Sequence, residues 1–218
     1  MPEGWKKQPR DSKGRWTKKG TAITAAAAVG IVVAGTASGL GGGGASTSAV
    51  QGARAGSQGR ASGKEAARKG QRDAAWQRMG LKVVRKAAET ELRCATRSFG
   101  QAQQFFLRTP CRKLDRLLLA LGDGQGNSVA VSIAWVRMAS AKDASRFKNL
   151  VDTQGTGNIT PLGGAALGLA EIHFTGRYYD SHQKGALVVN AEATPIGGHP
   201  GEQLLHDIAD VADEFPPP

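Results

Sequence analysis

The chain has few cysteines and lacks the common catalytic motifs. Only Cys94 and Cys111 occur among 218 residues, and they form no C-x-x-C pair, which excludes a multi-cysteine zinc site. No G-x-S-x-G element is present, which argues against a serine hydrolase. The four histidines show no metal-ligand spacing with either cysteine. The sequence therefore predicts no catalytic, metal or cofactor site, and we expect the chain not to be an enzyme.

Ionisable residues are absent from Gly20 to Ala53. Within this run, Thr21–Leu40 would span roughly 30 Å as a helix, which is the thickness of a bilayer core. Seven Lys/Arg precede the run, and only Arg54 and Arg60 occur in the twenty residues after Leu40. This asymmetry predicts a single transmembrane helix at residues 21–40 with a cytoplasmic N-terminus and an extracytoplasmic C-terminal domain in the cell membrane. The alternative is a cleaved signal peptide, which would also export the rest of the chain.

Residues 1–20 form a basic arm in which tryptophans alternate with cations. Anionic lipid headgroups attract such cations, and indole rings favour the membrane interface. The arm is therefore predicted to be cytoplasmic and to contact the membrane surface. The predicted contact residues are Trp5, Lys6, Lys7, Arg10, Lys13, Arg15, Trp16, Lys18 and Lys19. Nucleic acid is the second partner that this composition could bind.

The two cysteines are predicted to form a disulfide. They are the only cysteines in the chain, and they fall in the part predicted to be exported, where disulfides persist. Closing a loop of about seventeen residues would stabilise a small domain by roughly 3 kcal/mol. We therefore expect a structural bond that joins a long helix to the segment before the first strand.

Charge is unevenly distributed along the chain, whose net charge is +11. Residues 51–116 carry sixteen Lys/Arg and five Asp/Glu, whereas residues 117–218 carry six and eleven. The basic part, here called the basic stem, could bind an anionic polymer or could be a solvated surface that holds the domain away from the membrane. The sequence leaves both alternatives open.

Composition divides the rest of the chain into a linker and a domain. Residues 41–63 are rich in Gly, Ala and Ser, which predicts a flexible tether. From Lys64, apolar residues recur at intervals of three, four and seven as far as Cys94, which predicts a long amphipathic helix. Residues 64–218 are then expected to fold as one exported domain.

Two units, each a β-hairpin followed by a helix, are predicted after this long helix. A helix is predicted at residues 98–107, with Ser98 and Gln101 as a capping box, and another begins at Ser140 with a capping box to Asp143. Strands are predicted on either side of residues 123–127, at residues 171–179 and at residues 185–194, and a last helix at residues 201–215. The expected fold is α+β, with a four-stranded, mainly antiparallel sheet and helices on one face. The opposite face would be free for binding.

Several short motifs carry a resemblance to a known group of proteins. They are Cys94, Ser98-Phe99-Gly100-Gln101, Phe105-Phe106, Pro110-Cys111, Leu114-Asp115-Arg116 and Gly155-Thr156-Gly157-Asn158. With these motifs the chain resembles uncharacterised actinobacterial single-pass membrane proteins that have a basic arm and an exported α+β domain with two cysteines. The resemblance covers residues 90–160 and implies a membrane location and a disulfide, but no activity.

Three functions remain open from the sequence. The favoured one is a membrane-tethered extracytoplasmic binding or sensor-like accessory protein of the cell envelope, with an envelope protein or polymer as its partner. The first alternative is electrostatic binding of DNA or an anionic wall polymer through the basic stem. The second is an enzyme of unrecognised type, which would require Asp180, His182 and Glu192 to converge in one pocket.

Overall fold

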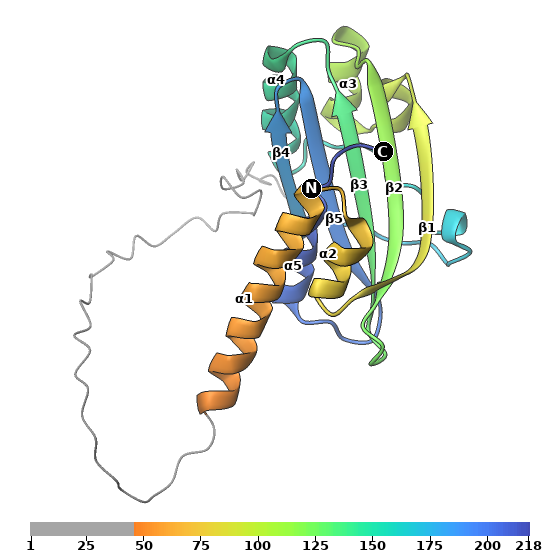
Figure 1. Ribbon diagram of the computed structural model, residues 1–218. Coiled ribbons are helices and arrows are strands. Elements are labelled where there is room, and N and C mark those ends of the chain that lie inside the picture. Colours follow the sequence, from red (N-terminus) through yellow and green to blue (C-terminus); the bar gives the residue numbers. More distant parts are fainter. Residues whose placement is uncertain (1–45) are drawn as a thin grey trace, which may run out of the picture.

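The centre of the fold is one antiparallel sheet of five strands in the order β1-β2-β3-β5-β4 (Figure 1). The computed structural model describes the backbone of residues 46–218 and the side chains of residues 56–218. The strands are β1 (Lys82–Glu91), β2 (Lys113–Gly122), β3 (Ser128–Arg137), β4 (Tyr178–Lys184) and β5 (Leu187–Gly197). The helices are α1 (Ser46–Arg68), α2 (Arg72–Arg78), α3 (Gly100–Arg108), α4 (Ala141–Val151) and α5 (Glu202–Ala212), with the 3-10 turns η1 (Cys94–Arg97) and η2 (Gly164–Leu167). The predicted α+β class is confirmed, and the sheet has one strand more than predicted.

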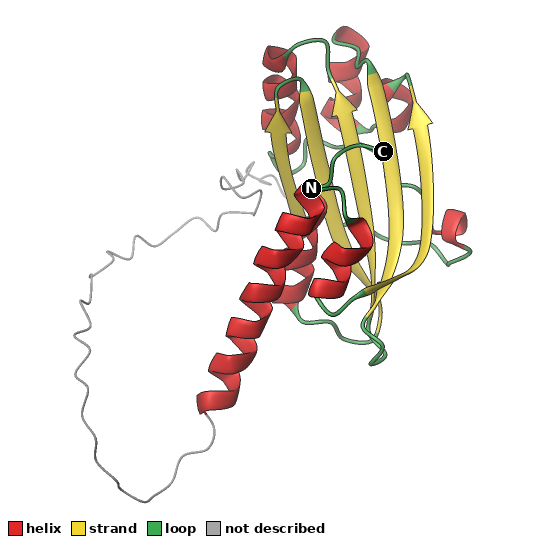
Figure 2. Cartoon of the chain, viewed as in Figure 1, coloured by secondary structure: helices red, strands yellow, loops and turns green. Residues whose placement is uncertain are grey.

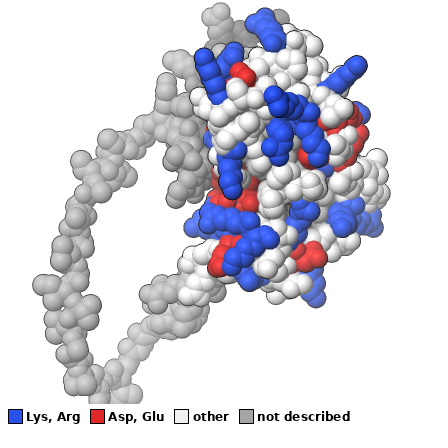
Figure 3. Space-filling view, turned by 45° about the horizontal axis from the view of Figure 1, so that its top comes forward, with Lys and Arg blue, Asp and Glu red and all other residues white. Residues whose placement is uncertain are grey.

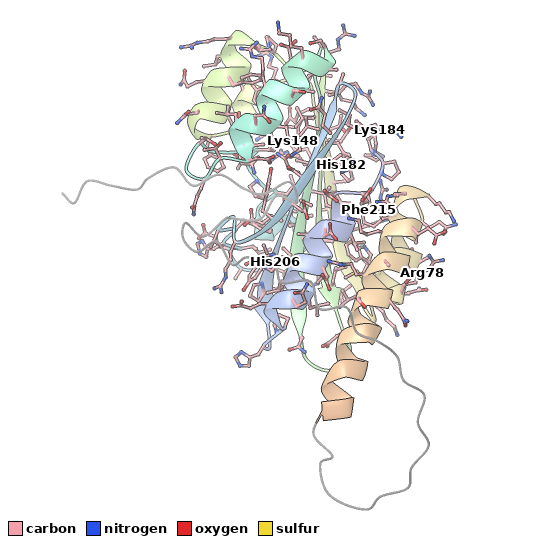
Figure 4. All side chains as sticks on the ribbon, turned by 90° about the vertical axis from the view of Figure 1, so that its left-hand side faces the viewer. Arg78, Lys148, His182, Lys184, His206 and Phe215 are labelled. Atoms are coloured by element: carbon pink, nitrogen blue, oxygen red, sulfur yellow. A yellow bond between two sulfur atoms is a disulfide. The ribbon has the colours of Figure 1, made fainter. Side chains whose placement is uncertain are left out.

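Helices cover both faces of the sheet, whereas the sequence predicted helices on one face (Figures 2 and 4). On one face, here called the α5 face, α1, α2 and α5 pack on residues such as Leu119, Val131 and Ile133. On the other, the α4 face, α3 and α4 cover part of the sheet, and the segment around η2 covers Leu118 and Ala120. The continuous apolar run in β2 follows from this burial of both faces. Within the described part of the chain, neither face of the sheet is free of helices, so the open binding face that was predicted is not present.

The long helix predicted to start at Lys64 is replaced by two helices and a strand. α1 ends at Arg68, α2 is short, and the chain then enters β1. Gly70 and Gly80, with φ of +72° and +75°, adopt the left-handed conformation that commonly ends helices. Trp76 of α2 and Val83 of β1 both pack on the α5 face. The spacing that predicted one long helix therefore comes from residues in two different elements.

Most of the segment predicted to be a flexible linker is helical in the structure, since α1 begins at Ser46. Its glycines permit close packing here. A Cβ atom on Gly59 would lie 2.9 Å from the Arg78 carbonyl oxygen, and one on Gly63 would lie 3.2 Å from the Ala75 carbonyl oxygen. The glycine content that predicted a tether therefore lets α2 pack directly against α1.

Several of the predicted elements are present. The β2–β3 hairpin turns at residues 123–127, and Ser140 Oγ accepts a hydrogen bond of 3.1 Å from the Asp143 amide, as its capping box predicted.

The capping box predicted at Ser98 was wrong, because Ser98 Oγ donates to the Cys94 carbonyl at 2.9 Å and Phe99 is the residue before α3. The strand predicted at residues 171–179 was also wrong in position, since β4 begins only at Tyr178.

The predicted membrane segment lies outside the described residues. No helix within residues 46–218 is long and apolar enough to cross a bilayer. The span Thr21–Leu40 and the arm residues from Trp5 to Lys19 precede the described part of the chain, so they stay predictions.

Candidate binding site

The predicted disulfide between Cys94 and Cys111 is confirmed. The two Cα atoms lie 6.0 Å apart, and the bond joins η1 to the residues just before β2. Cys94 therefore belongs to a 3-10 turn and not to the long helix that was expected. The bond fixes the segment that carries α3 to the end of the sheet.

The cations of the basic stem that face α5 are paired with carboxylates of α5 and of the residues just after it. Lys64 Nζ lies 2.7 Å from Asp210 Oδ1 and 3.2 Å from Glu214 Oε1, and Arg68 Nη2 lies 2.6 Å from Glu214 Oε1. We call this set the α1–α5 zipper: Arg60, Lys64 and Arg68 with Asp207, Asp210 and Glu214. Burial acts to lower the pKa of Lys64, but the two carboxylates outweigh it and raise that pKa. The basic and acidic parts of the sequence thus meet in one interface.

A cavity of about 630 Å³, here called the α2 cavity, lies on the α5 face between α2 and the first two strands. Its apolar lining comes from Trp76, Trp135, Leu117 and Leu119, and its polar lining includes Arg72 and Lys86. A cavity of this size with mostly apolar walls and a few polar groups is typical of small-molecule sites.

The aromatic wall of the α2 cavity is held by the residues after α5. Trp135 Nε1 donates a hydrogen bond of 2.7 Å to the Phe215 carbonyl, and the Phe215 ring packs edge to face on Trp76 with centroids 5.3 Å apart. The Arg72 guanidinium lies over the Trp135 ring at 5.7 Å and donates from Nη2 to the Pro216 carbonyl at 3.1 Å. The wall is therefore ordered by packing and hydrogen bonds from three elements.

Two hydrogen-bond donors of residues that line the α2 cavity have no partner among the described residues. They are Nε of Arg72 and Nε1 of Trp76, and both atoms are buried. A buried donor without a partner costs about 1–3 kcal/mol. Because both atoms are buried, neither can reach a ligand in the cavity. The charged residues of the lining are Arg72, Lys86 and Arg116 with one acid, Asp73, so the net positive charge favours an anionic ligand with an apolar body.

A second polar group, formed by Asp180, His182 and Asp213, is buried between β4 and α5. Nδ1 of His182 lies 3.4 Å from Oδ2 of Asp213, and Figure 4 shows His182 on the strand near Phe215. Burial, with the nearby carboxylates of Asp213 and Asp210, raises the pKa of Asp180 to about 8. Burial likewise raises the pKa of Asp213, although His182 acts to lower it. These groups make the docking of α5 on β4 sensitive to pH.

The three residues of the enzyme hypothesis do not all converge. Asp180 and His182 lie on the α5 face, whereas Glu192 lies on the α4 face and accepts a hydrogen bond from the Gly176 amide. The nearby hydroxyl of Ser181 donates to Asp152 Oδ1 at 2.6 Å on the α4 face as well, so it does not reach His182. Among the described residues, no group of three or more His, Cys, Asp or Glu side chains could hold a metal ion. The geometry therefore does not assemble the site that this hypothesis required.

Sequence reasoning did not find the α2 cavity or the α1–α5 zipper. The zipper had a signal, because Arg60, Lys64 and Arg68 recur every four residues and so lie along one side of a helix. The cavity had almost none, since Arg72 and Trp135 are sixty-three positions apart and meet only through the sheet.

Comparison with known protein families, with curated proteins and with solved structures finds no match to this chain. The candidate site therefore rests on its own geometry.

Proposed function

We propose that this chain is a membrane-tethered extracytoplasmic binding or sensor-like accessory protein of the cell envelope, whose exported domain binds an apolar acid in the α2 cavity. The charge-free Thr21–Leu40 and the cations before it support the tether. The Cys94–Cys111 bond supports an oxidising compartment.

The observation that carries the ligand class is the excess of cations beside the apolar wall. Trp76 and Leu119 offer apolar contact, whereas three cations in the lining outnumber its one acid, Asp73. A carboxylate attached to an alkyl or aromatic body satisfies both requirements. The domain then works by capture at the membrane surface, where a tether raises its effective concentration.

Binding of decanoate to the full chain, followed by tryptophan fluorescence, tests the ligand class. We expect saturable binding that Arg72→Met weakens by at least about tenfold, because a hydrogen bond to a charged group contributes roughly 1.5–3 kcal/mol. Decanol, which has the same alkyl chain without the charge, should bind more weakly than decanoate. Equal binding of the two would contradict the proposed role of the cations.

A matched pair of substitutions on β1 tests the position of the site. Ala88 lines the cavity, so Ala88→Phe should fill it and abolish decanoate binding. Val84 is 64 % exposed on the same strand and does not line the cavity, so Val84→Phe should leave binding unchanged.

Reporters fused to both ends of the chain test the tether separately, since a C-terminal reporter active only in the cytoplasm would overturn it.

A further inference from the structure

One end of the sheet carries a group of cations, of which all but one lack an ion pair among the described residues. We call it the basic end: Arg93, Arg108, Arg112, Lys113, Arg137, Lys142 and Lys184. These residues come from the ends of β1, α3, β3 and β4 and the starts of β2 and α4, which meet at the top of Figure 1. Figure 3, in which this end is turned toward the viewer, shows more Lys and Arg than Asp and Glu over it.

The strand register places three of these cations in one row. Lys113 of β2 is directly opposite Arg137 of β3, Arg137 is opposite Leu187 of β5, and Leu187 is opposite Lys184 of β4. Residues paired in this way share one face of the sheet, and neighbouring strands lie about 4.8 Å apart. The row therefore runs straight across four strands, with a cation at three of its four positions.

The folded chain provides almost no internal counter-charge here. Six of the seven cations have no ion pair among the described residues, and the exception is Lys113, which lies 3.0 Å from Asp115 Oδ2. The nearby Asp143 is already bonded to Ser140 and paired with Arg146. Because Lys113 and Arg137 repel each other across the strands, this arrangement costs stability unless an outside anion is bound.

The basic end is also rigidly held. The Cys94–Cys111 bond fixes the residues beside Arg93 and Arg112, and the Arg112 amide donates a hydrogen bond of 2.7 Å to the Arg137 carbonyl. A surface fixed in this way loses little conformational entropy when it binds.

We infer that the basic end binds a linear phosphodiester polymer of the cell envelope. This inference rests on the tether proposed above. The straight row of cations matches the repeated charges of a linear polymer. The position of α1 favours a polymer over the anchoring membrane, because this helix begins at the end of the molecule opposite the basic end (Figure 1) and is about 34 Å long.

The test measures binding of poly(glycerol phosphate) to the full chain in phosphatidylcholine nanodiscs at several salt concentrations. In the triple variant Arg112→Gln, Arg137→Gln, Lys184→Gln, we expect binding to weaken roughly 10- to 100-fold at low salt. The slope of log affinity against log salt should fall by about 2–3, because each lost phosphate contact removes about 0.7–0.9 from it.

The matched control is Lys69→Gln, Arg78→Gln, Lys82→Gln, which removes the same charge away from the basic end. Figure 4 shows Arg78 beside α1, well below Lys184, which lies near the upper end of β4. The control should bind the polymer as the unmodified chain does. Equal weakening of both triples would overturn the inference in favour of diffuse net charge.

Two further probes separate other anions from the polymer. Leu92, beside Arg93, is 73 % exposed, so tighter binding to phosphatidylglycerol vesicles that Leu92→Ser removes would assign the surface to lipid instead. Duplex DNA bound more tightly than poly(glycerol phosphate) at equal phosphate would assign it to nucleic acid. A cytoplasmic C-terminal reporter would overturn the tether alone, since polymer binding in nanodiscs is measured independently of topology.

Discussion

The α1–α5 zipper and the basic end use the same residue types in opposite ways. In the zipper, every cation faces a carboxylate from α5 or the residues just after it, and the charges are partly buried apart from that of Arg68, which is exposed. At the basic end, the cations are exposed and all but Lys113 lack an ion pair among the described residues. The sum of charge along the sequence is therefore a poor guide to function, because pairing across the fold decides which cations can meet a ligand.

The two regions should respond differently to substitution. A partly buried ion pair leaves an uncompensated charge when one partner is removed, whereas an exposed cation remains solvated and contributes little to stability. Loss of zipper charges should therefore reduce stability, and loss of basic-end charges should reduce binding.

The largest expected effect comes from the bond that supports the basic end. Cys94→Ala with Cys111→Ala should lower the free energy of unfolding by about 3 kcal/mol, because the loop of 17 residues is no longer closed in the unfolded chain. Urea unfolding of the full chain checks the value. Unchanged stability, or two free thiols in protein taken from its native compartment, would show that the bond has no structural role there.

Reversal of one charge in the α1–α5 zipper tests the other region of the comparison. Lys64→Glu places a third carboxylate beside Asp210 and Glu214, so we expect a loss of about 2 kcal/mol in urea unfolding. Asp210→Lys added to this variant restores opposite charges and should recover part of the loss. If the double variant loses as much free energy of unfolding as the two single variants together, the pair makes no direct contribution to stability.

Removal of the buried charge of Asp180, beside the zipper, should stabilise the folded chain. The pKa of Asp180 is about 8 in the folded chain and has an ordinary value of 3.8, so the unfolded chain binds fewer protons between about pH 4 and pH 8. Stability from this group is therefore complete below about pH 4 and falls as pH rises toward 8. Asp180→Asn should raise the free energy of unfolding by about 2 kcal/mol near pH 7.5 and should have no effect near pH 3.5. A gain that is the same at both pH values would point to packing instead.

The smallest expected effect is at the basic end itself. Arg137→Gln removes repulsion across the strands with Lys113, so thermal unfolding should show no loss and a gain of roughly 0.3 kcal/mol. A loss of 1 kcal/mol or more would mean that Arg137 is structural, and the contrast with the zipper would fail.

Local signals in the sequence predicted the parts of the fold that depend on neighbouring residues. The turn at residues 123–127, the Ser140 cap and the periodicity of the last helix each act within a few positions. The long helix failed because its repeating apolar residues belong to different elements, and Trp76 of α2 and Val83 of β1 pack on the same face although Gly80 separates them. Burial of both sheet faces could have been read from the uninterrupted apolar run in β2, but not which helices supply the cover.

The candidate site was less predictable than the fold. Arg72 and Trp135 are brought together only by strand pairing and by the segment around Phe215, and no spacing in the sequence encodes that contact. The basic end likewise depends on register, since a shift of one residue would place Lys113 and Arg137 on different faces.

α1 carries two sets of contacts that depend on the same rotation about its axis. Gly59 and Gly63 lie against α2, while Lys64 and its neighbours face α5. One inserted residue between Gly63 and Lys64 would turn one set by about 100° relative to the other, so both could not be satisfied together. A segment whose composition suggests a spacer of adjustable length thus tolerates no change of length at this point.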